Sequence, residues 1–256
     1  MKHLLFALTI SVFLIGCKKE ENNNEDSSAI GDSRNCTLKD KHNPNLIYDT
    51  IKDIDGNTYK TIQIGNQTWM AENLRTTKYR NGVSLPNIKN NTDWKNIDSG
   101  AYCFYDNNIN NDCPYGKLYN WYAVNNSNKI CPEGWHIPST GEWQNLIIFL
   151  GSNDVASGKL KSTGGQYWLS PNEGATNSSG FSALPGGSRS GSRIGGGEFK
   201  ELRNYGSWYS STRTNAVGVS GETGGSQCYG MSYYSDDVYK FGSTVTDGLS
   251  VRCVKD

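Results

Sequence analysis

The chain has 256 residues, of which 35% are hydrophobic, and it carries 25 Lys and Arg residues against 25 Asp and Glu residues. This balance gives no global positive field, so it argues against nucleic acid or an anionic membrane surface as a binding partner. The hydrophobic fraction is low for a globular protein, but 7 Trp and 15 Tyr residues supply large rings that can close one core between turns made by 29 Gly residues.

Residues 1–16 have the pattern of an export signal. A short polar start precedes an apolar run that ends at Ile15, and this run is shorter than the roughly 20 residues that span a bilayer as a helix. The run leads into Leu-Ile-Gly-Cys at Cys17, which resembles a bacterial lipobox. We therefore expect cleavage before Cys17 and acylation of its thiol, which would anchor the protein to the membrane. The alternative is an ordinary signal peptide followed by a chance cysteine.

The next stretch, residues 18–35, is almost wholly polar and has no hydrophobic period, as is typical of a disordered tether. We place the lipidated cysteine and tether at 17–45 and the folded domain at 46–256. An acidic stretch directly after the anchor also resembles the export signals of some surface lipoproteins. It predicts an outer-membrane lipoprotein exposed at the cell surface.

The domain is expected to begin with an antiparallel meander. Asp55-Gly56-Asn57 is a hairpin signal between strands at 47–54 and 58–64, and Gly65-Asn66 precedes a third strand at 67–72. After a weakly patterned excursion over 75–100, we expect a short strand at 101–105 and a short helix at 116–124.

A capping box marks the central helix. Ser139 stands three residues before Glu142, so the hydroxyl and the carboxylate can each bond a backbone N–H of the first turn. Apolar residues then recur at helical spacing until Gly151, which is the stop expected past a helix end. The pattern predicts a helix from Ser139 to about Leu150, on which the aromatic core is built.

Glycine and serine dominate from Gly164 onward. We expect a helical piece near 154–161, then strands at 181–184, 207–211, 229–234 and 249–254, with a long loop between the first two strands. Aromatic residues in or beside the glycine-rich loops are candidate ligand-binding residues, because flat rings with a polar tip suit sugar faces and protein partners. The alternative is that most of them fill the core. They are Tyr167, Trp168, Trp208, Tyr209, Tyr233 and Tyr234.

No catalytic pattern stands out. His136 lies inside the central stretch, where a buried, hydrogen-bonded structural role is favoured over a general base, and Glu142 is explained as a helix cap. The sequence has no nucleophile elbow, no phosphate loop and no zinc-ligand spacing. We expect no cofactor and no bound metal.

Three motifs of the chain are Asp55-Gly56-Asn57, Trp69-Met70-Ala71-Glu72-Asn73-Leu74 and Cys131-Pro132-Glu133-Gly134-Trp135-His136-Ile137-Pro138. With further short segments, they resemble the domain family named after the major paralogous proteins of Fibrobacter succinogenes. That family is distantly similar to C-type-lectin-like and sulfatase-modifying-enzyme-like domains. The resemblance implies an α+β, C-type-lectin-like fold with antiparallel sheets, two or three short helices and long Gly/Ser-rich loops, and it implies no settled activity. The reactive cysteines and calcium loops of the distant relatives have no counterpart here. The matching segments include residues 55–57, 67–74, 115–121, 131–138, 142–143, 185–187 and 250–253.

Six cysteines besides Cys17 remain, and paired cysteines persist in an oxidising envelope. Sequence alone allows fifteen connectivities. The resemblance to lectin-like folds implies a Cys131–Cys253 bridge. Cys103 and Cys113 flank an Asn-rich loop and are the next natural pair, which leaves Cys36 with Cys228.

Together these features predict a non-enzymatic, surface-anchored recognition module that binds a glycan or a protein. The alternatives are an extracellular enzyme acting on polysaccharide or protein thiols and a purely structural envelope component.

Overall fold

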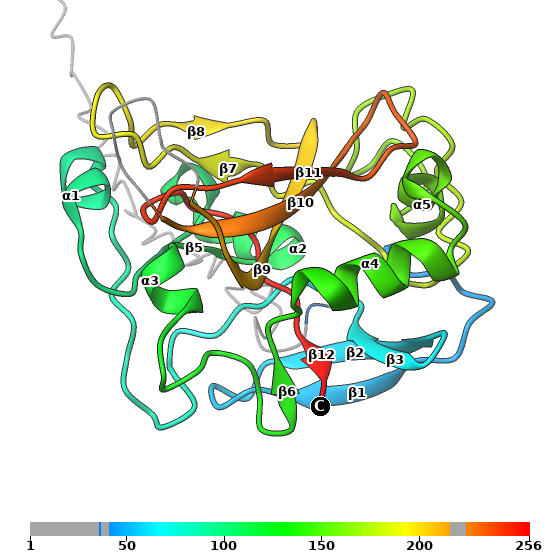
Figure 1. The fold of residues 1–256 in the computed structure, drawn as a ribbon, viewed down its shortest axis with the longest axis horizontal. Coiled ribbons are helices and arrows are strands. Elements are labelled where there is room, and N and C mark those ends of the chain that lie inside the picture. The colour runs from blue at the N-terminus through cyan, green and yellow to red at the C-terminus, as the bar shows by residue number, and fades with distance from the viewer. Residues whose placement is uncertain (1–35, 37–40, 216–223) are drawn as a thin grey trace, which may run out of the picture. The chain divides into compact units, whose positions relative to one another are not determined.

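The helix predicted at Ser139 is α4, Thr140–Phe149, and it lies between two antiparallel sheets (Figure 1). The computed structural model describes Cys36, residues 41–215 and residues 224–256. The capping box is present, with Ser139 accepting from the Glu142 backbone N–H and the Glu142 carboxylate accepting from the Ser139 N–H. The predicted start and nature of this helix are therefore confirmed.

The sheet on one side of α4 has the strand order β1-β2-β3-β12-β6, and the sheet on the other side has the order β11-β10-β9. All the pairs within them are antiparallel. The strands of the first sheet are β1 (Asp49–Lys52), β2 (Thr58–Ile64), β3 (Gln67–Met70), β6 (Trp135–His136) and β12 (Val254–Lys255); those of the second are β9 (Tyr205–Arg213), β10 (Ser226–Ser232) and β11 (Tyr239–Gly242).

Short elements complete the described part of the chain. Two further pairs join β4 (Tyr102–Cys103) to β5 (Leu118–Tyr119) and β7 (Ser188–Arg189) to β8 (Phe199–Lys200). The other α-helices are α1 (Asn91–Asn96), α2 (Asp112–Tyr115), α3 (Trp121–Val124) and α5 (Asn153–Leu160), and the 3-10 turns are η2 (Tyr105–Asn107) and η3 (Ile109–Asn111). The predicted α+β class with antiparallel sheets is confirmed, with five short helices in the described residues rather than two or three.

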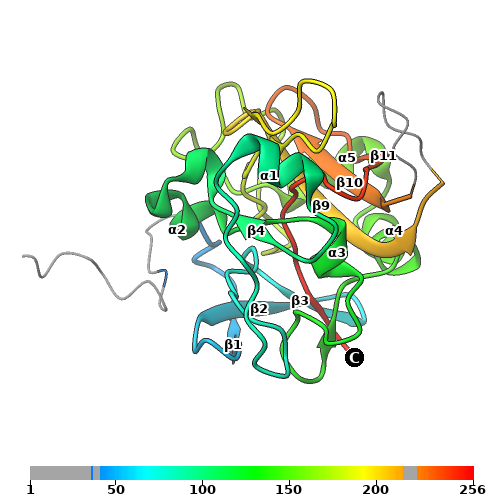
Figure 2. The same ribbon diagram turned by 90° about the vertical axis from the view of Figure 1, so that its left-hand side faces the viewer.

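The core is aromatic and is centred on Trp143 of α4. Its ring lies 5.1 Å from that of Trp69 on β3 and stacks at 5.0 Å on Tyr229 of β10, so one side chain joins both sheets to the helix. On β9 the pleat sends Trp208 toward α4 and Tyr209 to the opposite face, where the Trp121 ring lies 5.9 Å away. Trp121 belongs to helix α3, which lies near β9 in Figure 2. Alternate residues of one strand therefore fill two adjoining parts of the core.

Three predicted elements differ from the structure. The helix expected at 116–124 is strand β5 followed by the shorter α3. The stretch 181–184 is not a strand, because Ser182 has a φ of 56° and the guanidinium of Arg252 binds the carbonyls of Phe181 and Ser182. The stretch 249–254 pairs only through isolated bridges until β12, because it runs between the sheets and bonds to both sides.

Candidate functional site

Four of the six predicted ligand-binding aromatic residues are core residues, so that part of the prediction is wrong. Trp168, Trp208 and Tyr209 have no exposed surface and Tyr167 is 3% exposed. Their polar atoms are occupied inside the protein: the Trp208 indole donates to Asn73 Oδ1 at 2.8 Å, and the Tyr209 hydroxyl donates to the Asp247 carbonyl at 2.6 Å. A glycine places Trp208 in the core, since a Cβ at Gly206 would lie 2.2 Å from its ring.

The other two predicted residues belong to an exposed group of tyrosines. Tyr234 is 55% exposed and Tyr233 is half-buried, and their ring centroids lie 5.2 Å apart in an edge-to-face pair. The ring of Tyr205 lies 5.9 Å from that of Tyr234, and the ring of Tyr239 lies 6.1 Å from that of Tyr205. We call Tyr205, Tyr233, Tyr234 and Tyr239 the tyrosine row.

Tyr205 of β9 and Tyr239 of β11 lie on the sheet face that turns away from α4, whereas Tyr233 and Tyr234 follow the end of β10 and Tyr233 packs against the core around Trp143. Tyr239 of β11 is opposite Gly230 of β10, and a Cβ at Gly230 would lie 2.2 Å from the Tyr239 ring. The glycine therefore lets this ring lie flat across the sheet. Beside it on β11, the Phe241 ring lies 5.7 Å from Tyr239 and packs against the core, so one end of the row has a rigid support.

A short hydrogen bond joins two phenols of the row. The hydroxyls of Tyr205 and Tyr234 share a short hydrogen bond, which together with burial raises the pKa of Tyr205 to about 12. Burial raises the pKa of Tyr239 as well. At neutral pH these two phenols are therefore neutral groups that can donate and accept hydrogen bonds. The sequence did not predict Tyr205 and Tyr239 as binding residues, because the candidates were taken from the glycine-rich loops and both of these tyrosines lie on strands.

The imidazole of His136 connects strand β6 to helix α4 and to Asp256, the residue after β12. Its Nδ1 lies 2.6 Å from Asp256 Oδ1 and its Nε2 lies 2.7 Å from Glu142 Oε1, so carboxylates occupy both ring nitrogens. Although burial opposes the charged form, the bonds to Asp256 and Glu142 raise the pKa of His136. An imidazolium with both nitrogens engaged has no free nitrogen with which to take a proton from a substrate. The predicted hydrogen-bonded role fits this geometry, although the ring is partly exposed rather than buried.

The cysteines pair differently from the prediction in two cases out of three. Cys131 is bonded to Cys253, as the resemblance implied. Cys36 is bonded to Cys113, so the predicted Cys103–Cys113 and Cys36–Cys228 pairs are wrong.

Cys103 and Cys228 have free thiols and are buried. They lie in two different clusters of the core, so they do not pair with each other. Burial raises the pKa of both thiols to about 12. The thiolate is the reactive form of cysteine, so at neutral pH both side chains behave as small hydrophobic groups.

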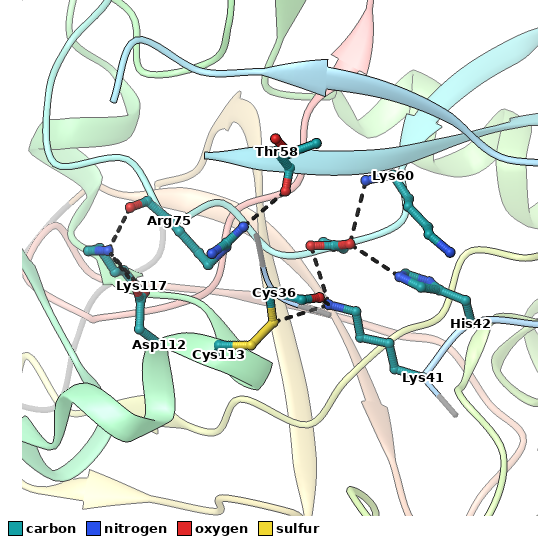
Figure 3. Close-up of a disulfide and its surroundings, with 10 residues drawn as sticks. Cys36, Lys41, His42, Thr58, Lys60, Arg75, Asp112, Cys113 and Lys117 are labelled. Carbon is teal, nitrogen blue, oxygen red and sulfur yellow. Dashed lines mark hydrogen bonds and ion pairs between the residues drawn. A yellow bond between two sulfur atoms is a disulfide. The ribbon is translucent and has the colours of Figure 1, made fainter. Parts of the chain in front are cut away.

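The Cys36–Cys113 bridge draws part of the predicted tether into the domain (Figure 3). Lys41 is 1% exposed, and its ammonium lies 3.3 Å from Glu72 Oε2 and 3.2 Å from the Cys36 carbonyl. The boundary expected at residue 46 is thus too late, because Lys41 and His42 both contact the buried Glu72, which follows β3.

Glu72 holds the centre of this buried group. Although burial opposes its charged form, the hydrogen bond from His42 and the charges of Lys41 and Arg75 lower the pKa of Glu72 to about 2. Burial lowers the pKa of Lys41 to about 8 despite the attraction of Glu72, so the ammonium is still charged at neutral pH. Burial also lowers the pKa of His42, whose ring is therefore neutral there.

His42 joins Glu72 to a serine. His42 Nε2 lies 3.1 Å from Glu72 Oε1, and His42 Nδ1 lies 3.4 Å from the hydroxyl of Ser182. A serine, histidine and carboxylate in a row is the order of a hydrolase triad. Ser182 is fully buried, however, and its hydroxyl also contacts Asn177 Nδ2 at 3.0 Å, so this serine has no access to a substrate. The chain of contacts fixes residues 41–42 on the domain.

In the part of the chain that the structure describes, no three His, Cys, Asp or Glu side chains gather in a group that could hold a metal ion. No helix among the described residues has the length and apolar character needed to cross a bilayer. The predicted signal peptide over 1–16, the lipidated Cys17 and most of the tether lie outside the described residues.

The fold therefore defines a disulfide-linked α+β domain with an exposed aromatic face. The family model of the Fibrobacter succinogenes major domain matches residues 62–255, and the chain belongs to this family. The comparisons with curated proteins and with solved structures gave no match.

Proposed function

We propose that this protein is a surface-anchored recognition module on a lectin-like scaffold that binds an extracellular glycan through the tyrosine row. The observation that carries the proposal is the contact of four tyrosine rings at one end of the β9–β10–β11 sheet, where Tyr234 is 55% exposed and the other three are half-buried. A cluster of partly exposed rings is costly unless it meets a ligand, because each ring is mostly apolar surface.

The geometry of the row suits a sugar. Ring faces pack against the C–H faces of pyranose units, while the phenol groups bond to the sugar hydroxyls. Phe241 supports the Tyr239 ring from the side of the core, and the lack of a side chain at Gly230 leaves room for that ring. Because the ring is already held in place, less conformational entropy is lost when a ligand binds. A protein ligand would use the same rings.

Two observations support binding without chemical transformation. Both nitrogens of His136 are engaged by carboxylates, and both free thiols are buried with raised pKa values. The alternative of an extracellular hydrolase would need the buried Ser182 to reach a substrate, although the contacts of Ser182, His42 and Glu72 follow the order of a catalytic triad. If that alternative holds, Ser182→Ala abolishes a hydrolytic activity of the folded protein.

The anchoring part of the proposal rests on the sequence of residues 1–17. Acylation at Cys17 and display at the outer-membrane surface would place the domain where extracellular glycans occur. Metabolic labelling with a fatty acid should mark the protein but not its Cys17→Ser variant. Protease added to intact cells should release the domain, and complete protection would contradict surface display.

A glycan array with the full-length protein tests the ligand. Binding should fall at least tenfold for Tyr234→Ala and Tyr205→Ala. The matched control is Tyr122→Ala, which removes a half-buried tyrosine outside the row. Equal binding by all three variants, or a blank array with every preparation folded, would contradict a glycan-binding role for the row. Capture of a protein by the row instead would assign the site to a protein ligand.

A further inference from the structure

We propose a second ligand site, in which a pocket beside Tyr48 binds the carboxylate of a hexuronate unit through the ammonium group of Lys60. This site lies on β2 and on the segment before β1, and it shares no residue with the tyrosine row. It goes beyond the proposed function, because neither site requires the other.

The pocket has the size of a small-molecule site. Its volume is about 540 Å³, within the range of roughly 300–1,000 Å³ that is usual for such sites. His42, Tyr48 and Lys60 line it together with Thr163, the first residue of an exposed Thr-Gly-Gly-Gln loop. A Cβ added to either glycine of that loop would meet no atom within 4 Å, so the space above the loop is open to a ligand.

Lys60 offers the pocket a cation that the domain has not neutralised. Its side chain is exposed, and no carboxylate of the described residues lies within ion-pair distance of its ammonium. The ammonium lies 5.2 Å from the centre of the Tyr48 ring. A cation–π contact at an exposed position is weak, so it orients Lys60 and leaves its N–H groups available for a ligand.

The charged residues next to the pocket also favour an anionic ligand. Figure 3 shows the Lys60 side chain extending to the same side of the buried charged group as His42. Glu72 is already compensated by Lys41 at 3.3 Å and by the charge of Arg75, and His42 is neutral, so the charges around the pocket, with Lys60, are positive on balance. An anionic ligand is therefore favoured over a cationic one, and over an otherwise identical neutral one.

The rest of the lining narrows the ligand to a sugar acid. A small carboxylate ion could bind the ammonium of Lys60, but it would make no hydrogen bond to the other polar groups that line the pocket. Thr163 also lines the pocket and its hydroxyl can bond to ring hydroxyls, while the ring of Tyr48 offers an apolar wall. A hexuronate unit carries a carboxylate and several hydroxyl groups on the same sugar ring, so it can bind both Lys60 and the other polar groups.

Titration of the full-length protein followed by NMR chemical shifts tests this assignment. The probes are D-glucuronate, its uncharged methyl ester and acetate. We expect D-glucuronate to bind at least tenfold more tightly than either other probe, with shifts at Thr163 and Lys60, and to weaken as salt is raised. Lys60→Met, which keeps the aliphatic stem, should bring D-glucuronate down to the affinity of the ester.

The matched control is Lys52→Met, which removes another exposed lysine of the same sheet and should leave binding unchanged. The site is overturned if the ester binds as well as the acid, if acetate binds as well as D-glucuronate, or if the two lysine variants behave alike. Because Tyr234→Ala should not alter this titration, failure here is distinguishable from failure of the tyrosine row.

Discussion

The Nε2 atom of His136 lies 2.7 Å from Glu142 Oε1, and this contact ties strand β6 to the first turn of α4. The same carboxylate caps the helix through Ser139, so one side chain serves both elements. Asp256 binds the other ring nitrogen and adds the end of β12 to the cluster.

This arrangement predicts a pH dependence of stability. The pKa of His136 is raised above its ordinary 6.5 and that of Glu142 is lowered below its ordinary 4.5. The histidine contribution is complete below pH 6.5 and is lost as the pH rises through the folded value, whereas the glutamate contribution is lost as the pH falls through its own. The stabilisation should therefore be largest between about pH 4.5 and 6.5.

Urea unfolding of the wild type and of His136→Gln checks this prediction. Because the ring is partly exposed, we expect a difference below about 1 kcal/mol in the free energy of unfolding at pH 5.5, shrinking by pH 9. A difference that stays constant over this range would show that the charge of His136 contributes nothing.

Glu72 and Lys41 should behave as a coupled buried pair. Glu72→Gln leaves the ammonium of Lys41 buried without its carboxylate, which we expect to lower the free energy of unfolding by about 3 kcal/mol. Adding Lys41→Met to that variant should restore part of the loss. Lys78→Met, which breaks the more exposed pair with Asp55, is the control and should cost less than about 1 kcal/mol. Additive losses in the double variant would contradict the coupling.

The two free thiols should be inert in the folded protein. Iodoacetamide should label neither Cys103 nor Cys228 under native conditions, because both are buried with pKa values of about 12. Both should be labelled after unfolding without reductant. Non-reducing peptide mapping should then yield the Cys36–Cys113 and Cys131–Cys253 peptides, and a Cys103–Cys113 peptide would contradict the structure.

Gly230 gives a way to disturb the tyrosine row without removing a tyrosine. Gly230→Ala places a methyl group where the Tyr239 ring lies, so the ring must leave the sheet surface. We expect glycan binding to fall as far as it does in Tyr239→Ala, at least fivefold, while Tyr239→Phe keeps the ring and most of the binding. Unchanged binding in Gly230→Ala would show that the position of this ring is unimportant.

Local signals in the sequence predicted the elements whose cause is local. The capping box at Ser139 and the turn at Asp55-Gly56-Asn57 specify α4 and the β1–β2 hairpin, and both are present. The resemblance to lectin-like folds supplied the Cys131–Cys253 bridge, which periodicity does not encode.

The features that the sequence did not predict depend on contacts between residues that are far apart in the chain. Trp208 lies beside glycines and so appeared exposed, but Asn73, 135 positions away, accepts its indole N–H in the core. Lys161 is buried because three backbone carbonyls from two separate loops surround its ammonium. The tyrosine row forms only when β9 and β11 flank β10, so its members show no common pattern along the chain.

The two sulfur bridges also determine how the domain would respond to mechanical pulling between its ends. Residues 36–113 form one covalently closed loop and residues 131–253 form another, so a force applied along the chain bypasses everything inside them. Between Cys36 and Cys253, only the stretch from Cys113 to Cys131 is left to lengthen. At about 3.3–3.6 Å per residue it can extend by no more than roughly 65 Å. Pulling between those two cysteines would therefore leave both the tyrosine row and the pocket at Lys60 inside the protected loops.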